Sequence, residues 1–292
     1  MTTEPPPTTT PTYGFIGLGH QGTPMAQMMI HDGLRPWLWA RRAEVLDRYR
    51  DADAHIAASP AEVGANSDVI GLCLYDADAT DAVLFGEDGV MTAIRPGTVL
   101  AMHATVGPDY VRDLATRVEP RGVHVVDAPV SGADAALERK LLVIVGGDDT
   151  AIERCHPMFD TYAGRVARVG GIGAAQAAKL INNALMTAIT GLVFDAFELG
   201  ESLGIAPTAL GDVLANGSAA NPSVNFFLAL GGAEEFSIRA WPTLHKDVDL
   251  VSDAASRRDL NDCQLITTAT ATIRAMERLR APYVERRARE QA

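Results

Sequence analysis

YGFIGLGHQGTPMA, residues Tyr13–Ala26, joins a short apolar run to a G-x-G-x-x-G pattern and then to a segment with helical character. A strand that turns through such glycines into a helix is typical of the first unit of a dinucleotide-binding sheet. Gly17 permits the tight turn, Gly19 lets the backbone approach a pyrophosphate, and Gly22 lets helix and strand pack closely. The freed backbone amides and the helix dipole then hold the anion. We therefore predict that the cofactor is bound by Gly17, Leu18, Gly19, His20, Gln21 and Gly22.

Further apolar runs follow at the spacing expected of alternating strands and helices. They are Trp37–Ala40, Asp68–Leu74, Thr98–Ala104, Val123–Pro129 and Leu141–Gly147. Most are almost continuously apolar, as strands that are covered on both faces must be. Segments of helical length, such as Pro24–His31 and Ala43–Arg50, lie between the first runs. This alternation predicts an α/β fold in which an N-terminal Rossmann domain contains a doubly wound parallel sheet.

The character of the sequence changes after Gly173. Residues from Ala174 to about Gly204 are rich in Ala and Leu and include no Pro, which predicts one long helix with Gly191 inside it. Further helices are expected at Pro207–Asn216, Ser223–Leu230, Leu244–Arg257 and Cys263–Leu279. We predict a disordered Pro- and Thr-rich tail over residues 1–12, a dinucleotide-binding Rossmann domain over 13–170, and an all-α C-terminal domain over 171–292 for substrate binding and dimerisation.

The composition argues against several classes of protein. A formal net charge of −12 is unsuited to a nucleic-acid partner, which requires a basic face. The first twelve residues lack the basic and apolar regions of a secretory signal, and no apolar run approaches a membrane-spanning length. The three cysteines are far apart and the histidines lack metal-ligand spacing, so we expect neither disulfides nor a metal site. These features predict a cytoplasmic protein with no membrane or nucleic-acid partner.

The end of the second apolar run is expected to choose between NAD and NADP. An acidic residue there would accept hydrogen bonds from the ribose hydroxyls and repel a 2′-phosphate. This chain has Arg41 and Arg42 instead, and its first acid, Glu44, falls in the segment predicted as the next helix. Two guanidinium groups suit a phosphate because Arg binds it bidentately and keeps its charge. NADP is therefore favoured over NAD, although both arginines could also be solvated groups at the end of a strand.

Four blocks of the sequence resemble the 3-hydroxyisobutyrate dehydrogenase, or β-hydroxyacid dehydrogenase, family. They are Gly14–Ala26, with Gln21 where the family has Met; DAPVSG at Asp127–Gly132; Gly170–Gly173 with Lys179, Asn182 and Asn183; and Lys246-Asp247. The blocks stand in the family's order and span most of the chain. Four matches in order are a much more specific signal than any one of them.

The resemblance implies an oxidoreductase that interconverts a small β-hydroxy acid and its semialdehyde or keto acid, with Lys179 as general acid and base. Such chemistry needs a group that takes or returns the hydroxyl proton. Lys179 is the only basic residue between Arg168 and Arg239, and partial burial could lower its pKa toward working pH. Asn183 follows four residues later on the same helical face and can hydrogen-bond the substrate.

The resemblance also implies how the substrate is held. Ser131 and the Gly132 amide would bind the substrate carboxylate, and Thr105 would lie near the nicotinamide. Lys246, positioned by Asp247, would close the far side of the site and contact both substrate and cofactor. Two departures from the family surround this loop: Ala133 replaces a second Gly, and Arg139 occupies a position that is usually small. They leave open which acid is used, with 3-hydroxyisobutyrate, tartronate semialdehyde and succinic semialdehyde among the candidates.

Two other functions remain compatible with this pattern. An NADPH-dependent imine reductase has the same architecture but usually lacks the helix lysine, so Lys179 argues against it. A non-catalytic dinucleotide-binding sensor would keep the fold without the chemistry. The presence of both Lys179 and Asn183 speaks against a dead site. For any of these functions, the long apolar helix predicts a homodimer or a higher homo-oligomer.

Overall fold

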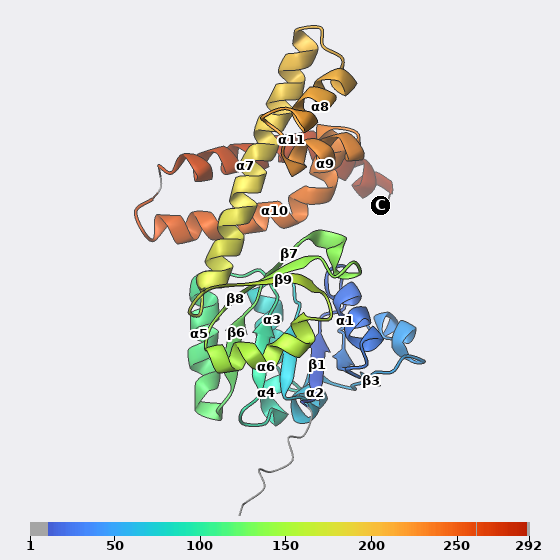
Figure 1. Ribbon diagram of the computed structural model, residues 1–292, viewed down its shortest axis with the longest axis vertical. Coiled ribbons are helices and arrows are strands. Elements are labelled where there is room, and N and C mark those ends of the chain that lie inside the picture. Colours follow the sequence, from blue (N-terminus) through green and yellow to red (C-terminus); the bar gives the residue numbers. More distant parts are fainter. Residues whose placement is uncertain (1–10, 261, 291–292) are drawn as a thin grey trace, which may run out of the picture. The chain divides into compact units, whose positions relative to one another are not determined.

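The computed structural model describes residues 11–260 and 262–290 (Figure 1). The chain divides into two compact units, of which the first ends at Lys179 and the second starts at Leu180. Most of the predicted N-terminal tail, residues 1–10, lies outside the described residues, but Thr12 belongs to the fold because its backbone N–H and its hydroxyl both donate to Asp68. The predicted domain boundary between residues 170 and 171 lies at the end of the last strand, nine residues before the end of the first unit.

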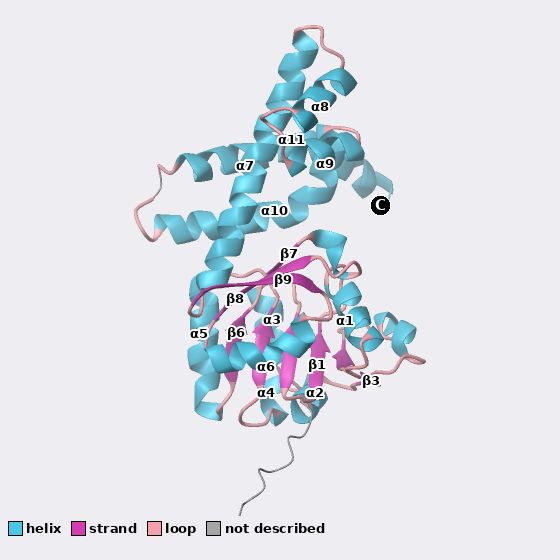
Figure 2. Cartoon of the chain, viewed as in Figure 1, coloured by secondary structure: helices cyan, strands magenta, loops and turns pink. Residues whose placement is uncertain are grey.

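A mostly parallel sheet forms the centre of the first unit (Figure 2). Its strands are β1 (Tyr13–Ile16), β2 (Trp37–Trp39), β3 (His55–Ile56), β4 (Val69–Leu72), β5 (Val99–Met102), β6 (His124–Asp127), β7 (Val130–Ser131), β8 (Leu141–Gly146) and β9 (Ala163–Gly170). They are ordered β3-β2-β1-β4-β5-β6-β8-β7, and β9 pairs with β8 in parallel. β8 runs antiparallel to β6 and β7, and β9, which is parallel to β8, therefore runs opposite to them as well. The predicted parallel sheet is thus confirmed for its main part and corrected at this end.

Helices cover both faces of the sheet, as a doubly wound fold requires. Those of the first unit are α1 (Gly22–His31), α2 (Pro60–Asn66), α3 (Ala77–Phe85), α4 (Val90–Ala93), α5 (Pro108–Val118) and α6 (Asp149–Phe159). On one face, Met25 of α1 and Phe159 of α6 are fully buried in a cluster with Phe15 of β1. On the other face, α2–α5 bury their apolar side chains against alternate residues of β1, β4 and β5. The Rossmann prediction is confirmed.

One local prediction in this unit was wrong, and the strands β3, β7 and β9 were not predicted. Ala43–Arg50 forms two short 3₁₀ helices, Ala43–Val45 and Asp47–Tyr49, in place of one α-helix. The buried residues Leu46 and Tyr49 stand three residues apart, a spacing that suits the tighter turn. Strand β9 was missed because it lies at an edge, where most of its side chains contact solvent and form no apolar run.

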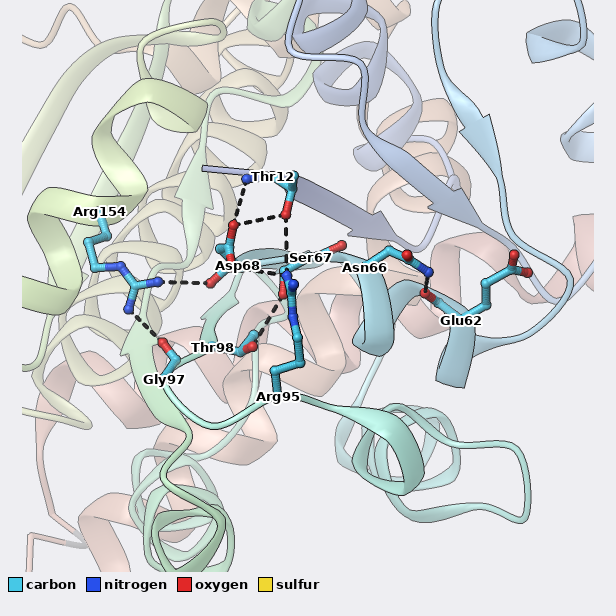
Figure 3. A network of polar contacts seen from close by, with 9 residues as sticks. All are labelled: Thr12, Glu62, Asn66, Ser67, Asp68, Arg95, Gly97, Thr98 and Arg154. Atoms are coloured by element: carbon cyan, nitrogen blue, oxygen red, sulfur yellow. Dashed lines mark hydrogen bonds and ion pairs between the residues drawn. The ribbon is translucent and has the colours of Figure 1, made fainter. Parts of the chain in front are cut away.

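A polar network holds the amino ends of the strands together (Figure 3). Arg95 pairs with the Asp68 carboxylate at 3.0 Å, and Arg154 donates to the Gly97 carbonyl at 2.5 Å. The Thr98 hydroxyl donates to the Ser67 carbonyl at 3.2 Å. This network is at the opposite edge of the sheet from the glycine loop, so its role is structural.

The second unit is helical. Its elements are α7 (Ala174–Ser202), which begins in the first unit, and α8 (Pro207–Asn216), α9 (Pro222–Leu230), α10 (Ala233–Ser256) and α11 (Gln264–Glu290). Figure 1 shows α10 and α11 running alongside each other. The predicted all-α character is confirmed, but α10 begins eleven residues before the predicted Leu244 and continues through Pro242. Phe236 and Leu244, on either side of that proline, are buried in one core cluster, and their packing outweighs the lost hydrogen bond.

The length of α7 corrects one expectation from composition. By length and composition this helix could cross a membrane, contrary to the prediction that no apolar run approaches that size. Half of its most apolar window is buried within the fold, and core helices of globular proteins have the same composition.

Candidate active site

The glycine loop joins the carboxyl end of β1 to α1 in the first unit. Gly17 has φ +100°, and a Cβ atom there would collide with the Cys73 carbonyl oxygen. A Cβ at Gly22 would collide with the Gly17 carbonyl oxygen, so both positions require glycine. At Gly19, by contrast, a Cβ would meet nothing within 4 Å. The backbone at Gly19 is therefore open to close approach by a ligand, and α1 starts beside it without a side-chain cap.

Arg41 and Arg42 follow β2 and are both exposed. The guanidinium of Arg42 lies 3.9 Å from the Glu44 carboxylate, and both side chains are about two-thirds exposed. So weak a surface pair leaves Arg42 able to bind another anion. The structure thus presents two cations next to the strand that follows the glycine loop, and the Gly17 N–H donates to the Trp39 carbonyl of that strand.

The loop after β5 is held by a residue that sequence reasoning missed. Gln176 of α7 is fully buried, and its Oε1 accepts from the Val106 N–H at 3.0 Å. Its Nε2 donates to the Ala104 carbonyl at 2.9 Å. Thr105, the residue predicted to lie near the nicotinamide, is between these two contacts and half-buried. One side-chain amide therefore attaches the first turns of α7 to the loop that carries Thr105.

Asp127, at the end of β6, is the second group that sequence reasoning did not assign. Its side chain is fully buried, and Oδ2 accepts from the backbone N–H groups of Gly173 at 3.1 Å and Gln176 at 3.0 Å. Burial raises the pKa of Asp127 to about 6, although these N–H donors favour the carboxylate and oppose the rise. Its position at the head of the DAPVSG motif was the signal that could have identified it.

Lys179 lies on α7 three residues after Gln176, on the same helical side. Only 8% of its surface is exposed. The predicted partners of Lys179 on the second unit form a cluster of their own. The Asn183 Nδ2 donates to Asp247 Oδ2 at 2.6 Å, and Lys246 Nζ lies 3.0 Å from Asp247 Oδ1. Asp247 is only 1% exposed, so one buried carboxylate orients both Asn183 and Lys246.

The predicted carboxylate loop follows β6 directly. Ser131 ends the short strand β7, where it pairs with Leu142 of β8. Gly132 is exposed and has φ +128°, a conformation that favours glycine. The loop ends at Arg139, which has φ +52° and donates to both carboxylate oxygens of Asp32, at 2.9 and 2.6 Å. These hydrogen bonds lower the pKa of Asp32, and they explain why a large residue can stand at position 139.

His103, beside this loop, has a structural role. Its Nδ1 lies 2.7 Å from the Ala128 carbonyl and its Nε2 lies 3.0 Å from the Tyr162 hydroxyl, and the side chain is buried. Burial lowers the pKa of His103 to about 4, so the imidazole is neutral at physiological pH.

Within the first unit, the predicted residues gather at one edge of the sheet. The glycine loop follows β1, Thr105 follows β5, and Ser131 follows β6, and these three strands run parallel with β4 between β1 and β5. In an open α/β sheet the carboxyl edge is where ligands bind. The first turns of α7, with Lys179, are attached to the same edge through Asp127 and Gln176.

Two family models match the chain in succession. Residues 12–171 match the NAD binding domain of 6-phosphogluconate dehydrogenase. Residues 173–282 match the model described as NAD-binding of NADP-dependent 3-hydroxyisobutyrate dehydrogenase.

Two curated proteins with similar sequences are named as dehydrogenases of a hydroxy acid. The chain is 36% identical over 203 residues to L-threonate dehydrogenase of Cupriavidus necator, which is 69% of this chain and 68% of that protein. It is 31% identical over 202 residues to mitochondrial 3-hydroxyisobutyrate dehydrogenase of Mus musculus, covering 69% of this chain and 60% of that one.

Solved structures share the fold. A 3-hydroxyisobutyrate dehydrogenase of Mycobacterium tuberculosis, solved with L-serine, has a TM-score of 0.81 at 24% identity and covers 92% of this chain and 94% of its own. An imine reductase of Myxococcus stipitatus with NADP⁺ has a TM-score of 0.63 at 18% identity, covering 91% and 94%.

Proposed function

Because the chain belongs to the 3-hydroxyisobutyrate dehydrogenase family of NAD(P)-dependent β-hydroxyacid dehydrogenases, we propose that it interconverts a small β-hydroxy acid and its semialdehyde or keto acid, with Lys179 as general acid and base. The observation that carries this proposal is a buried lysine on a helix whose start is attached to the ligand-binding edge of the sheet. A lysine in that setting can exchange a proton with a bound substrate while it is shielded from bulk water.

The loop Gly17–Gly22 fits a nicotinamide dinucleotide. The open face at Gly19 and the start of α1 suit the pyrophosphate, and Thr105 suits the nicotinamide end. The chemistry that the bound nicotinamide supplies is the acceptance or return of a hydride at the substrate carbon. We assign the adenosine 2′-phosphate to Arg41 and Arg42, which makes NADP the preferred cofactor.

Lys179 supplies the proton chemistry in this proposal. In oxidation its neutral amine accepts the hydroxyl proton, and in reduction its ammonium returns that proton to the carbonyl oxygen. Asn183 is one helical turn later and holds the same substrate by a hydrogen bond, while its own Nδ2 is oriented by Asp247. Lys246 pairs with the same carboxylate, and we assign it to the binding of substrate and cofactor.

Ser131 and the Gly132 amide hold the substrate carboxylate in this proposal. The loop presents a hydroxyl and a backbone N–H together, both suited to an anion. The relatives named for L-threonate, L-serine and 3-hydroxyisobutyrate support a carboxylate-bearing substrate, since each of these is a hydroxy acid.

The test compares wild type with Lys179→Ala on a panel of hydroxy acids and aldehyde acids, each with NADPH and NADH. We expect cofactor binding and folding to be retained and kcat to fall by about two to four orders of magnitude, the usual weight of general acid–base catalysis. The matched control is Lys140→Ala, which removes an exposed lysine paired with Glu138 and leaves kcat unchanged.

Each competing function gives its own result in that experiment. If Lys179→Ala kept more than about a tenth of wild-type turnover, the lysine would lose the proton-transfer role. Reduction of cyclic imines, without activity on any acid of the panel, would favour an imine reductase, whose fold this chain shares. Tight cofactor binding with no turnover of either acids or imines would favour a non-catalytic dinucleotide-binding sensor.

A further inference from the structure

We propose that Asp127 and Gln176 are positioning residues that fix the first turns of α7 and thereby set the place of the Lys179 amine. This inference rests on the proposed role of Lys179. It assigns a purpose to two buried polar side chains that come from different parts of the sequence, both fully inaccessible to solvent.

We refer to the hydrogen bonds that Asp127 and Gln176 make around the start of α7 as the anchor. The first half of the anchor is the Asp127 carboxylate. The first four N–H groups of any helix have no partner within the helix, and a carboxylate there also meets the positive end of the helix dipole. Asp127 Oδ2 accepts two such groups, the N–H of Gly173 and the N–H of Gln176. The start of α7 is therefore bound to the end of β6, from which the carboxylate loop departs.

The second half of the anchor is the Gln176 side chain, which uses both ends of its amide. Oε1 accepts from Val106 and Nε2 donates to Ala104, at 3.0 and 2.9 Å. The same helical turn is thus attached to the ends of two neighbouring strands, β5 and β6. An element held at two points in this way cannot slide or rotate without breaking buried hydrogen bonds.

Close backbone packing supports the anchor. A Cβ at Gly146, which pairs with Asp127 across β8 and β6, would lie 2.6 Å from the Gly171 carbonyl oxygen. Glycine at position 146 therefore lets the segment before α7 approach the sheet closely enough for the Asp127 hydrogen bonds to form.

Burying Asp127 carries a free-energy cost that a purely structural cap does not require. Among the described residues, its Oδ1 is buried without a hydrogen-bond partner, and burial raises its pKa. A surface helix is capped adequately by Ser, Thr or an exposed Asp, as Ser59, Asp76 and Asp148 cap other helices here. A buried carboxylate holding two amides gives the tighter placement that a proton-transfer residue needs, since an error of about 1 Å can cost roughly 100-fold in rate.

The experiment uses Asp127→Ala, Asp127→Asn and Gln176→Met in the full-length protein. Met keeps the volume of Gln but makes neither of its hydrogen bonds. Asn keeps an oxygen that can accept from the same two N–H groups. Thr98→Val is the matched control, because it removes one buried hydrogen bond, between Thr98 and Ser67 (Figure 3), at the opposite end of β5 from Ala104 and Val106.

Four quantities are measured. They are kcat, the cofactor dissociation constant, the rate of backbone hydrogen exchange of residues 173–179, and the rate at which an amine-reactive reagent modifies Lys179. The chain contains only three lysines, so exposed Lys140 serves as the internal reference in the mass spectrum. Exchange and modification report on the anchor whether or not the substrate class is right.

We expect Asp127→Ala and Gln176→Met to lower kcat by about 10- to 100-fold with cofactor binding unchanged. Backbone hydrogen exchange over residues 173–179 should become faster in these two variants. The rate at which Lys179 is modified should rise relative to the rate for Lys140. Asp127→Asn keeps an acceptor oxygen but loses the charge, so it should fall between wild type and Asp127→Ala in all four measurements. Thr98→Val should alter only stability.

The anchor is overturned if exchange and Lys179 modification stay at wild-type rates in Asp127→Ala and Gln176→Met. It is also overturned if Asp127→Asn is as impaired as Asp127→Ala, or if Thr98→Val lowers kcat as much as they do. If wild type turns over no hydroxy acid while exchange and modification respond as expected, the proposed function fails and the anchor stands.

Discussion

Single residues at the carboxyl edge differ in how far the fold constrains them. Only glycine fits at positions 17 and 22, because a Cβ atom at Gly17 or Gly22 would collide with a backbone carbonyl oxygen. A Cβ at Gly19 would meet nothing within 4 Å, so a ligand explains that glycine better than the fold does. Ser131 is half-buried, so its hydroxyl can meet a ligand. Predictions about binding therefore belong at residues of this second kind.

Ser131→Ala should raise the KM for a hydroxy acid by about 10- to 100-fold, the effect of losing one hydrogen bond to a charged group. The decarboxylated analogue, a plain alcohol or aldehyde, should be a poor substrate for wild type and no poorer for the variant, because it lacks the group that Ser131 holds. Steady-state kinetics on the matched pair of substrates measures both. Equal damage to both would contradict the carboxylate role.

Arg41→Ala combined with Arg42→Ala should weaken NADPH binding by roughly 2–4 kcal/mol and NADH binding much less, if two charge-assisted contacts are lost. Fluorescence titration with each cofactor measures the difference. The control pair, Arg48→Ala with Arg50→Ala, removes the same charge from exposed positions a few residues away. If NADPH and NADH weaken equally, the arginines do not recognise the 2′-phosphate.

At the scale of elements, α7 runs from the first unit into the second, and α11 packs closely against its middle. Gly191 lies in the middle of this helix, where a Cβ would collide with the Thr272 hydroxyl of α11. A glycine inside a helix ordinarily costs about 1 kcal/mol relative to Ala. The close approach of α11 explains the glycine at position 191, because any side chain there would prevent that approach.

Gly191→Ala should therefore destabilise the protein by about 1–3 kcal/mol through overpacking, despite the better helix propensity of Ala. Denaturant unfolding measures the change, and Thr272→Ala in the same chain should recover most of it. Gly200→Ala on the same helix is the control, since its Cβ would meet only the flexible end of Leu210. A stabilising effect of Gly191→Ala would mean that α11 does not pack against this position.

At the scale of the whole molecule, an exposed apolar stripe on α7 bears on oligomeric state. Ile181, Leu185, Leu192 and Leu199 are between 51% and 60% exposed and stand four, seven and seven residues apart, which places them along one side of the helix. Contiguous exposed apolar surface marks an interaction site. We propose that a second copy of the chain covers this stripe, in a homodimer or larger homo-oligomer.

Leu192→Glu with Leu199→Glu should convert that oligomer to a monomer, because two charges would be buried in an apolar contact. Light scattering after size-exclusion chromatography measures the mass. The control is Leu260→Glu, which changes an equally exposed leucine in the turn after α10. A monomeric wild type, or an oligomer that survives the double substitution, would contradict this role for the stripe.

Sequence reasoning worked where a signal was local. Apolar runs located β1, β2, β4, β5, β6 and β8, and Pro207–Asn216 was predicted to the residue as α8. It failed where neighbours decide. The edge strand β9 has no apolar run, and α10 crosses Pro242 because buried residues on both sides hold it.

The sequence alone determined the glycine loop, the alternation of strands and helices, and the position of a lone lysine on a long helix. Each of these depends on backbone geometry or periodicity within a few residues. Tertiary structure alone decided how Asp127 meets Gln176 and how Arg139 meets Asp32, pairs that are 49 and 107 residues apart. No local pattern encodes such contacts, because the free energy that holds them comes from burial and hydrogen bonding between segments that only the completed fold brings together.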